Sequence, residues 1–205
     1  MSASAEELLL RYRERFDGFP DPLFLAFEES LRALDKNLAQ AELTNWVEAG
    51  MSIMQTSLRS WEAAAEYFRA SSLMPEGTTW QIYKELGDQA KELTADSAPL
   101  AVAFLKSAPK IVKVPGFSSI TDWGVLGRNL YKGNWKSSSL AGQFFEASPD
   151  LLLILSNEET SCLVEFLDEL ARHSYELAAS CLSVAAEVLG LLEEADRLSY
   201  LSFGL

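Results

Sequence analysis

Apolar residues recur through most of this chain at the three- and four-residue spacing that places them on one face of a helix. The first 40 residues contain two such segments, at residues 4–16 and about 22–39. Between them, Asp17–Pro22 contains a glycine and two prolines, which cannot continue a helical hydrogen-bond ladder. After a helix pair within residues 41–74, the same spacing predicts helices at about 79–94, 97–107, 119–131, 137–147, 158–175, 178–195 and 196–203.

Polar residues and prolines indicate where several of these helices begin. Capping partners are expected for Ser4 with Glu7, Thr78 with Gln81, and Ser156 with Glu159, and a single cap from Asp96 or Ser97. Pro109 is expected to open a short helical turn at residues 109–113. Pro149 is expected to open another at about 149–155, with Ser148 as its cap.

One pattern occurs three times between Trp46 and Leu155. An aromatic residue precedes a glycine by four positions, and a bulky pair follows in the next helix. The three copies are Trp46, Gly50, Tyr67, Phe68; Tyr83, Gly87, Phe104, Leu105; and Trp123, Gly127, Phe144, Phe145. Copies one and two are offset by 37 residues at every position, and copies two and three by 40. This period, with two helices per unit, is typical of helical repeat proteins.

The repeat predicts an all-α fold: a right-handed, α-solenoid-like array of antiparallel helix pairs, with three to four units of 37–40 residues and an N-terminal cap. The whole chain is expected to form one domain. Its parts are the cap at 1–40, repeats at 41–77, 78–117 and 118–156, and a degenerate unit at 157–205. Because glycine inside a helix costs about 1 kcal/mol relative to alanine, the repeated glycine predicts close packing of the second-helix aromatic against backbone.

The charge distribution is uneven. The net charge is −13, which disfavours binding to nucleic acid or to an anionic membrane. Residues 106–136, however, carry six basic side chains and one acidic one. This stretch is either a solvated face or a patch that docks an acidic segment of a protein partner. The candidate contacts are Lys106, Lys110, Lys113, Arg128, Lys132, Trp135 and Lys136, with Trp135 as a partner anchor or a core residue.

No recognised set of catalytic, cofactor-binding or metal-binding residues is present in the sequence. There is no nucleophile elbow and no glycine-rich phosphate loop. The single histidine, His173, is expected at a surface, and Cys162 and Cys181 are expected to be buried or partly buried thiols. The N-terminus lacks signal-peptide features, and the apolar run 151–155 is too short to span a bilayer, so a cytoplasmic location is expected.

The repeated phrases resemble a known family. Trp61–Ser71 (WEAAAEYFRAS) and Ala141–Pro149 (AGQFFEASP) are similar to helical repeats of nitric oxide reductase activation proteins of the NorD type. In those proteins a helical region precedes a von Willebrand factor A domain, whose Asp-x-Ser-x-Ser motif is absent here. The resemblance implies an accessory role in activating a metalloenzyme together with a MoxR-type AAA+ ATPase. It also implies a chain that continues beyond Leu205.

The leading functional prediction is therefore a non-catalytic scaffold or adaptor that binds a protein partner. An alternative is a small-molecule or lipid-binding helical domain with an apolar pocket lined by the aromatic residues. A third is an enzyme whose type the sequence does not reveal.

Overall fold

A computed structural model describes residues 5–133 and 138–202 of the chain. Within these residues the protein is all-α, with eleven α-helices, one short 3-10 helix and no strand. Helices that are close in sequence pack against one another. The chain divides into two compact units, Met1–Pro109 and Lys110–Leu205, and each is described separately.

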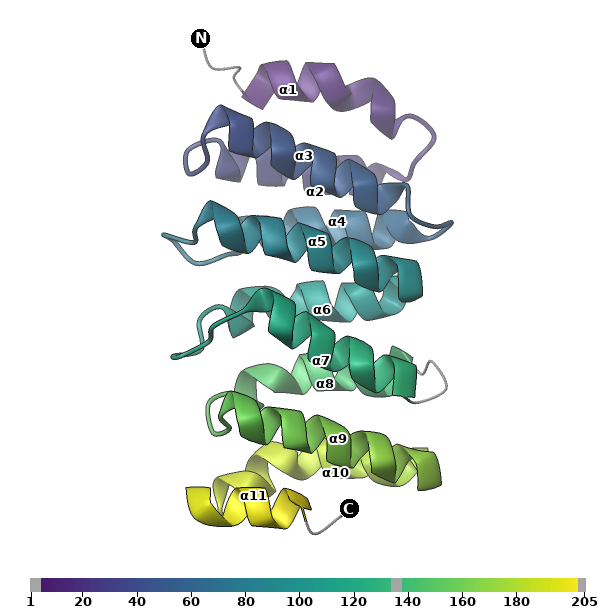
Figure 1. Ribbon diagram of the computed structural model, residues 1–205. Coiled ribbons are helices and arrows are strands. Elements are labelled where there is room, and N and C mark those ends of the chain that lie inside the picture. The colour runs from purple at the N-terminus through teal and green to yellow at the C-terminus, as the bar shows by residue number, and fades with distance from the viewer. Residues whose placement is uncertain (1–4, 134–137, 203–205) are drawn as a thin grey trace. The chain divides into compact units, whose positions relative to one another are not determined.

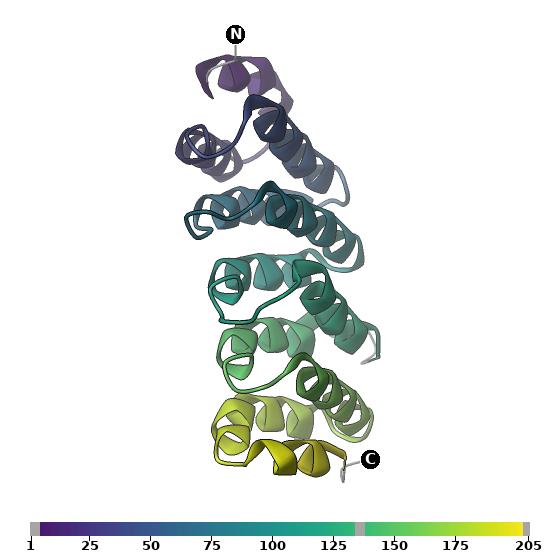
Figure 2. The same ribbon diagram turned by 60° about the vertical axis from the view of Figure 1, so that its left-hand side comes forward.

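Unit 1 arranges its helices in two layers. Helices α3 and α5 lie side by side in one layer, and α2 and α4 form the layer behind them (Figures 1 and 2). Tyr12 ties the first helix to this body, because its hydroxyl donates to Glu48 Oε1 at 2.7 Å. The elements are α1 (Ala5–Tyr12), η1 (Arg13–Phe16), α2 (Asp21–Leu34), α3 (Gln40–Met54), α4 (Ser60–Ser72), α5 (Trp80–Asp96) and α6 (Ala98–Ile111), whose last residues cross into unit 2.

Unit 2 repeats the two-layer arrangement. Helices α7 and α9 lie side by side, α8 and α10 form the second layer, and α11 packs on α9 (Figure 1). The elements are α7 (Ile120–Gly133), α8 (Ser138–Leu151), α9 (Asn157–His173), α10 (Tyr175–Gly190) and α11 (Glu194–Ser202). The helices predicted from the apolar spacing are confirmed, with ends shifted by one to five residues.

Copies one and three of the repeat have the same packing at the level of individual rings. Trp46 and Phe68 meet edge to face at 5.0 Å, and Trp123 and Phe145 do so at 5.0 Å. In both copies the residue before that phenylalanine lies 5.8 Å from it. A serine near the end of the second helix donates to the carbonyl four residues earlier, Ser71 at 2.7 Å and Ser148 at 2.6 Å.

The prediction of close packing at the repeated glycines is confirmed for two copies. A Cβ built at Gly50 would overlap the Phe68 ring, and one built at Gly127 would overlap the Phe145 ring. Gly87 differs, because its nearest neighbours are Ala49 at 3.1 Å and the Tyr67 hydroxyl at 3.2 Å. Copy two has Leu105 where the others have phenylalanine, and the close contact there comes from copy one.

The prolines do not start new helices as predicted. Helix α6 continues through Pro109 to Ile111, and α8 continues through Pro149 to Leu151. Ile111 and Leu151 are fully buried, so extending each helix completes its apolar face. The Leu152 N–H donates to Ser148 O at 2.9 Å, which carries the helical hydrogen-bond pattern past Pro149. Because the Ser148 hydroxyl bonds back to Phe144 O, Ser148 is not an N-cap.

The other predicted caps have mixed outcomes. Ser156 and Glu159 form the predicted capping box: Ser156 N donates to Glu159 Oε2 at 2.7 Å, and Glu159 N to Ser156 Oγ at 3.2 Å. The cap by Ser97 is confirmed by a bond from Leu100 N. Thr78 with Gln81 is wrong, because Thr78 donates to Pro75 O and Gln81 to Glu85. Ser4 lies outside the described residues.

Candidate functional site

Helix α7 has one buried face and one face that is exposed to solvent. Ser119 caps its start by accepting from Asp122 N at 3.0 Å, and Trp123 and Gly127 turn inward to meet the Phe145 ring. The opposite stripe, at spacing of three or four residues, is exposed; it comprises Asp122, Val125, Asn129 and Lys132. Val125, the apolar member of this stripe, is 40% exposed.

The candidate basic residues fall into two groups. Lys106 and Lys110 are one turn apart on α6, and Lys113 follows in the turn after it, where its N–H donates to Lys110 O at 3.1 Å. Arg128 and Lys132 are one turn apart on α7. Lys106 belongs to unit 1, and the other four belong to unit 2. Trp135 and Lys136 lie outside the described residues.

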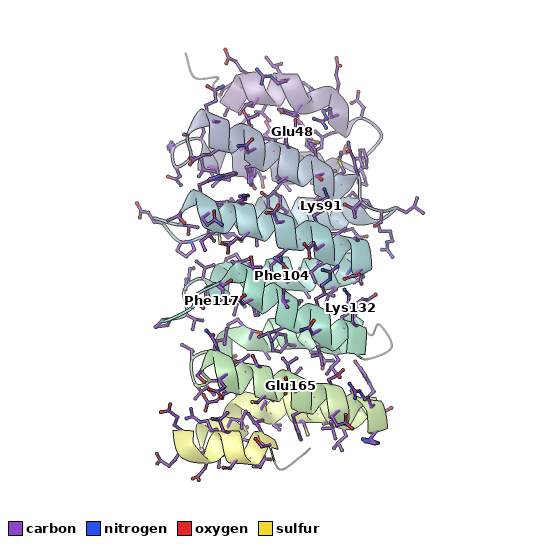
Figure 3. The ribbon with its side chains drawn as sticks, in the orientation of Figure 1. Glu48, Lys91, Phe104, Phe117, Lys132 and Glu165 are labelled. Carbon is purple, nitrogen blue, oxygen red and sulfur yellow. The ribbon has the colours of Figure 1, made fainter. Side chains whose placement is uncertain are left out.

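Within unit 2 the two groups are at opposite ends of α7. The 14 residues of this helix span about 21 Å. Lys110 and Lys113 come before its first turn, and Lys132 is in its last. Figure 3 shows Phe117 in the connection before α7 and Lys132 near the far end. The basic residues described in unit 2 therefore form one group that precedes α7 in the chain and one group in the second half of α7.

A groove of about 300 Å³ lies along the first half of α7. Its apolar lining includes Phe117, Val125, Leu126 and Leu152, and its polar lining includes Asp122, Asn157 and Ser161. Asn157 Nδ2 donates to Ser118 Oγ at 3.3 Å, which joins the start of α9 to the α7 connection. A second hollow of about 210 Å³ shares Phe117, Leu152 and Asn157 and extends to Val114. We refer to both hollows together as the α7 groove.

Several lining residues of the α7 groove were not among the sequence candidates. Phe117 comes from one lining segment, and Leu152 and Asn157 come from a second that lies about 35 residues further along the chain. The sequence offers one indication that Phe117 is a candidate. It directly follows Pro115-Gly116, so it is an aromatic residue in a turn and not in a helical stripe. No sequence pattern marks Leu152 or Asn157 as lining residues, because their position in the groove depends on how α8 and α9 are joined.

The isolated titratable candidates lie away from this groove. The His173 side chain is 77% exposed, with Nε2 3.4 Å from Glu169 Oε1, as expected of a surface histidine. Cys162 and Cys181 are free and partly buried, which confirms that prediction. Burial raises the pKa of the Cys162 thiol, and the nearby carboxylates of Glu165 and Glu158 raise it further.

Over the described residues, no three His, Cys, Asp or Glu side chains gather as a metal site would require. Among the same residues, none of the helices combines the length and the apolar character needed to cross a bilayer.

Comparison of the chain with protein-family models, with curated proteins and with solved structures gives no match.

Proposed function

We propose that this chain is a helical-repeat interaction domain of the right-handed α-solenoid type, and that it binds an acidic segment of a protein partner through the α7 groove. One observation carries the proposal. An apolar-lined groove lies along the first half of α7, Lys110 and Lys113 precede this helix in the chain, and Arg128 and Lys132 are in its second half. The partner segment would place a bulky apolar side chain between Val125 and Phe117 and acidic residues towards the two ends.

The polar lining supports an extended peptide as the occupant. The Asn157 side-chain amide and the Ser118 hydroxyl can each donate and accept, which matches the N–H and C=O groups of a peptide backbone. Leu126 and Leu152 offer apolar area between these polar groups. Interfaces of this kind take most of their affinity from one or two buried anchors, with charges at the rim setting specificity and association rate.

The proposed setting follows from the family resemblance. The domain acts as a non-catalytic scaffold in the cytoplasm, and the partner is a subunit of a metalloenzyme-activating assembly that includes an AAA+ ATPase. The small-molecule alternative has less support in the described residues, because the large aromatics it would use pack on each other. Phe27, for example, lies 5.3 Å from Phe68 and 6.2 Å from Trp46.

Selection from a display library of random linear peptides tests the proposal. Selected peptides should combine Asp or Glu with one bulky apolar residue, and their dissociation constants should rise with salt. Val125→Glu should weaken a selected peptide by about tenfold or more, because it places a carboxylate where the apolar anchor lies. Reversing charge at Arg128 and Lys132 together should weaken it by a similar factor and remove most of the salt dependence.

Lysines on unit 1 supply the matched control. Lys84 and Lys91 are exposed on α5 (Lys91 is labelled in Figure 3), and their reversal to Glu changes net charge by the same amount as the α7 pair. Binding should be unaffected by this control. If both charge-reversed proteins lose affinity for a selected peptide equally, binding depends on the net charge of the protein and the proposed α7 site is wrong.

A further inference from the structure

Helix α10 carries two apolar stripes, and only one of them is buried. Ala178, Leu182, Ala185 and Leu189 face inward. The second stripe is displaced by one residue, and its members are exposed or partly exposed; we call it the outward stripe. It consists of Leu177, Cys181, Val184 and Val188, and it continues to Leu191 directly after the helix. Leu177 is 51% exposed, Val184 is 46% and Leu191 is 84%. The cost of leaving these side chains in water makes this stripe a candidate contact surface.

The spacing of the outward stripe identifies the shape of what would cover it. Its members are separated by four, three, four and three residues. This alternation is the seam along which two helices pack side by side at a small crossing angle. A helical partner therefore fits the stripe along its whole length, whereas an extended peptide would meet only alternate positions.

Helix α11 provides the second wall. An apolar hollow of about 60 Å³ opens between Val184 and Val188 of α10 and Tyr200 of α11, with Phe166 of α9 in its floor. This volume is well below the several hundred Å³ of a cofactor pocket and is suited to single side chains. Cys181, Val184 and Val188 of the outward stripe line this hollow together with Tyr200. We call the hollow and the outward stripe together the α10–α11 trough.

The charge around this trough is strongly negative. Residues 156–202 contain ten carboxylates and two arginines, a net −8. Both arginines are engaged within the unit: Arg172 pairs with Asp168 and Glu169, and Arg197 bonds to the carbonyls of Leu189 and Leu192. Glu187, Glu193, Glu194 and Asp196 on or next to α10 and α11 are exposed.

We infer that the α10–α11 trough is a second protein-binding site and that it takes an amphipathic helix whose apolar face is bordered by Lys or Arg. A second copy of this face would bring like charges together, which opposes self-association through it. A basic-edged helix satisfies both the apolar seam and the acidic border. This site is separate from the α7 groove and does not depend on it, so the domain can hold two partners at once.

The inference is tested with a synthetic helical peptide of the same length as α10, with Leu at alternating four- and three-residue spacing and Lys on both borders. A second peptide has Glu in place of each Lys. The Lys peptide should bind the full chain, the Glu peptide should bind at least tenfold more weakly, and binding should protect Cys181, which lines the trough, from alkylation.

Val184→Glu separates trough binding from general attraction. The substitution adds negative charge, so it would strengthen a purely electrostatic association with the Lys peptide. If the peptide lies in the trough, it should weaken binding about tenfold, because a carboxylate then replaces a seam residue. Val184 is half exposed, so the variant should fold, which its circular dichroism spectrum checks.

Val125→Glu on α7 is the matched control and should leave Lys-peptide binding unchanged. Loss of binding in this control with retention in Val184→Glu would overturn the trough, because the Lys peptide would then lie at the α7 groove, and it would also contradict the acidic preference proposed for that groove. Concentration-dependent dimerisation of the free chain that Val184→Glu abolishes would also overturn it, since the occupant would then be a second copy. If the display selection yields no acidic peptide that binds, while the Lys peptide still binds as predicted, only the α7 proposal is overturned.

Discussion

At the scale of single residues, the repeat acts through size complementarity between a glycine and a ring. Gly50 and Gly127 each accept the phenylalanine of the following helix against bare backbone. The sequence predicted this contact because helical glycine is costly and its position recurred. It did not predict the exception at Gly87. Leucine at position 105 is shorter, and the atoms that crowd Gly87 belong to Ala49 and Tyr67 of another copy.

This difference predicts unequal effects of alanine at the three glycines. Gly50→Ala and Gly127→Ala should each lower the free energy of unfolding by about 1–2 kcal/mol, because displacing a buried ring outweighs the gain in helix propensity. Gly87→Ala should be close to neutral, since its neighbours are at 3.1 and 3.2 Å and need shift only slightly. Urea unfolding followed by circular dichroism measures all three.

The double variant Gly50→Ala/Phe68→Leu serves as the control. Leucine at position 68 reproduces the residue found in copy two. Gly50→Ala should therefore lower the free energy of unfolding by less in the Phe68→Leu background than in the wild type. Equal costs in the two backgrounds would contradict the proposed contact between Gly50 and Phe68.

At the scale of elements, periodicity located the helices but placed several of their ends incorrectly. The sequence predicts helix starts at Pro109 and Pro149, since proline at a first helical position is common. In the structure, buried Ile111 and Leu151 extend the preceding helices past them. The preference of proline for a helix start was outweighed by the burial of Ile111 in one helix and of Leu151 in the other. That burial depends on tertiary packing, which the local sequence does not reveal.

Helix α11 is held in part by Arg197, whose side chain is only 15% exposed. Arg197 donates to the carbonyls of Leu189 at 3.0 Å and Leu192 at 3.2 Å, and also to Ile154 O. Its guanidinium is 3.8 Å from Glu159 Oε1, and the Glu159 side chain is only 3% exposed. Replacing Arg197 therefore leaves a buried carboxylate without its cation and removes one donor from each of the three carbonyls.

Arg197→Met should consequently lower the free energy of unfolding by about 3 kcal/mol, measured by urea denaturation. Arg172→Met is the matched control. Its side chain is 56% exposed and its partners Asp168 and Glu169 are 19% and 36% exposed, so its effect should stay below about 1 kcal/mol. Adding Glu159→Gln should recover part of the loss in Arg197→Met, because the stranded charge is then removed. Equal effects of the two arginine substitutions would argue against the buried role of Arg197.

At the scale of the whole molecule, the sequence revealed the charge asymmetry but not the groove beside it. The α7 groove is lined from residues 114–126 and 152–161. These segments meet only because α9 stacks on α7 in unit 2, so no local pattern could have identified the lining. The basic residues were visible in the sequence, yet their separation into two groups depends on the length and direction of α7.

The net charge of −13 also predicts how stability responds to salt. Screening of self-repulsion should raise the melting temperature by a few degrees between about 10 mM and 300 mM NaCl. A variant with Gln at the exposed positions 187, 193 and 194 removes three of these charges and should show a smaller rise. Differential scanning calorimetry measures both, and a melting temperature that falls with salt in the parent chain would contradict the prediction.

The contact between glycine and phenylalanine lies within a single copy of the repeat, both in the first copy and in the third. Each copy contains both halves of its own fit, the missing Cβ and the ring that occupies the space. Duplicating such a copy therefore keeps this contact, because both of its partners are copied together. Copy two lacks this independence, because the space at Gly87 is taken up by Ala49 and Tyr67. An engineer who wishes to lengthen the chain should therefore multiply the Gly127–Phe145 copy and leave copy two next to its present neighbour.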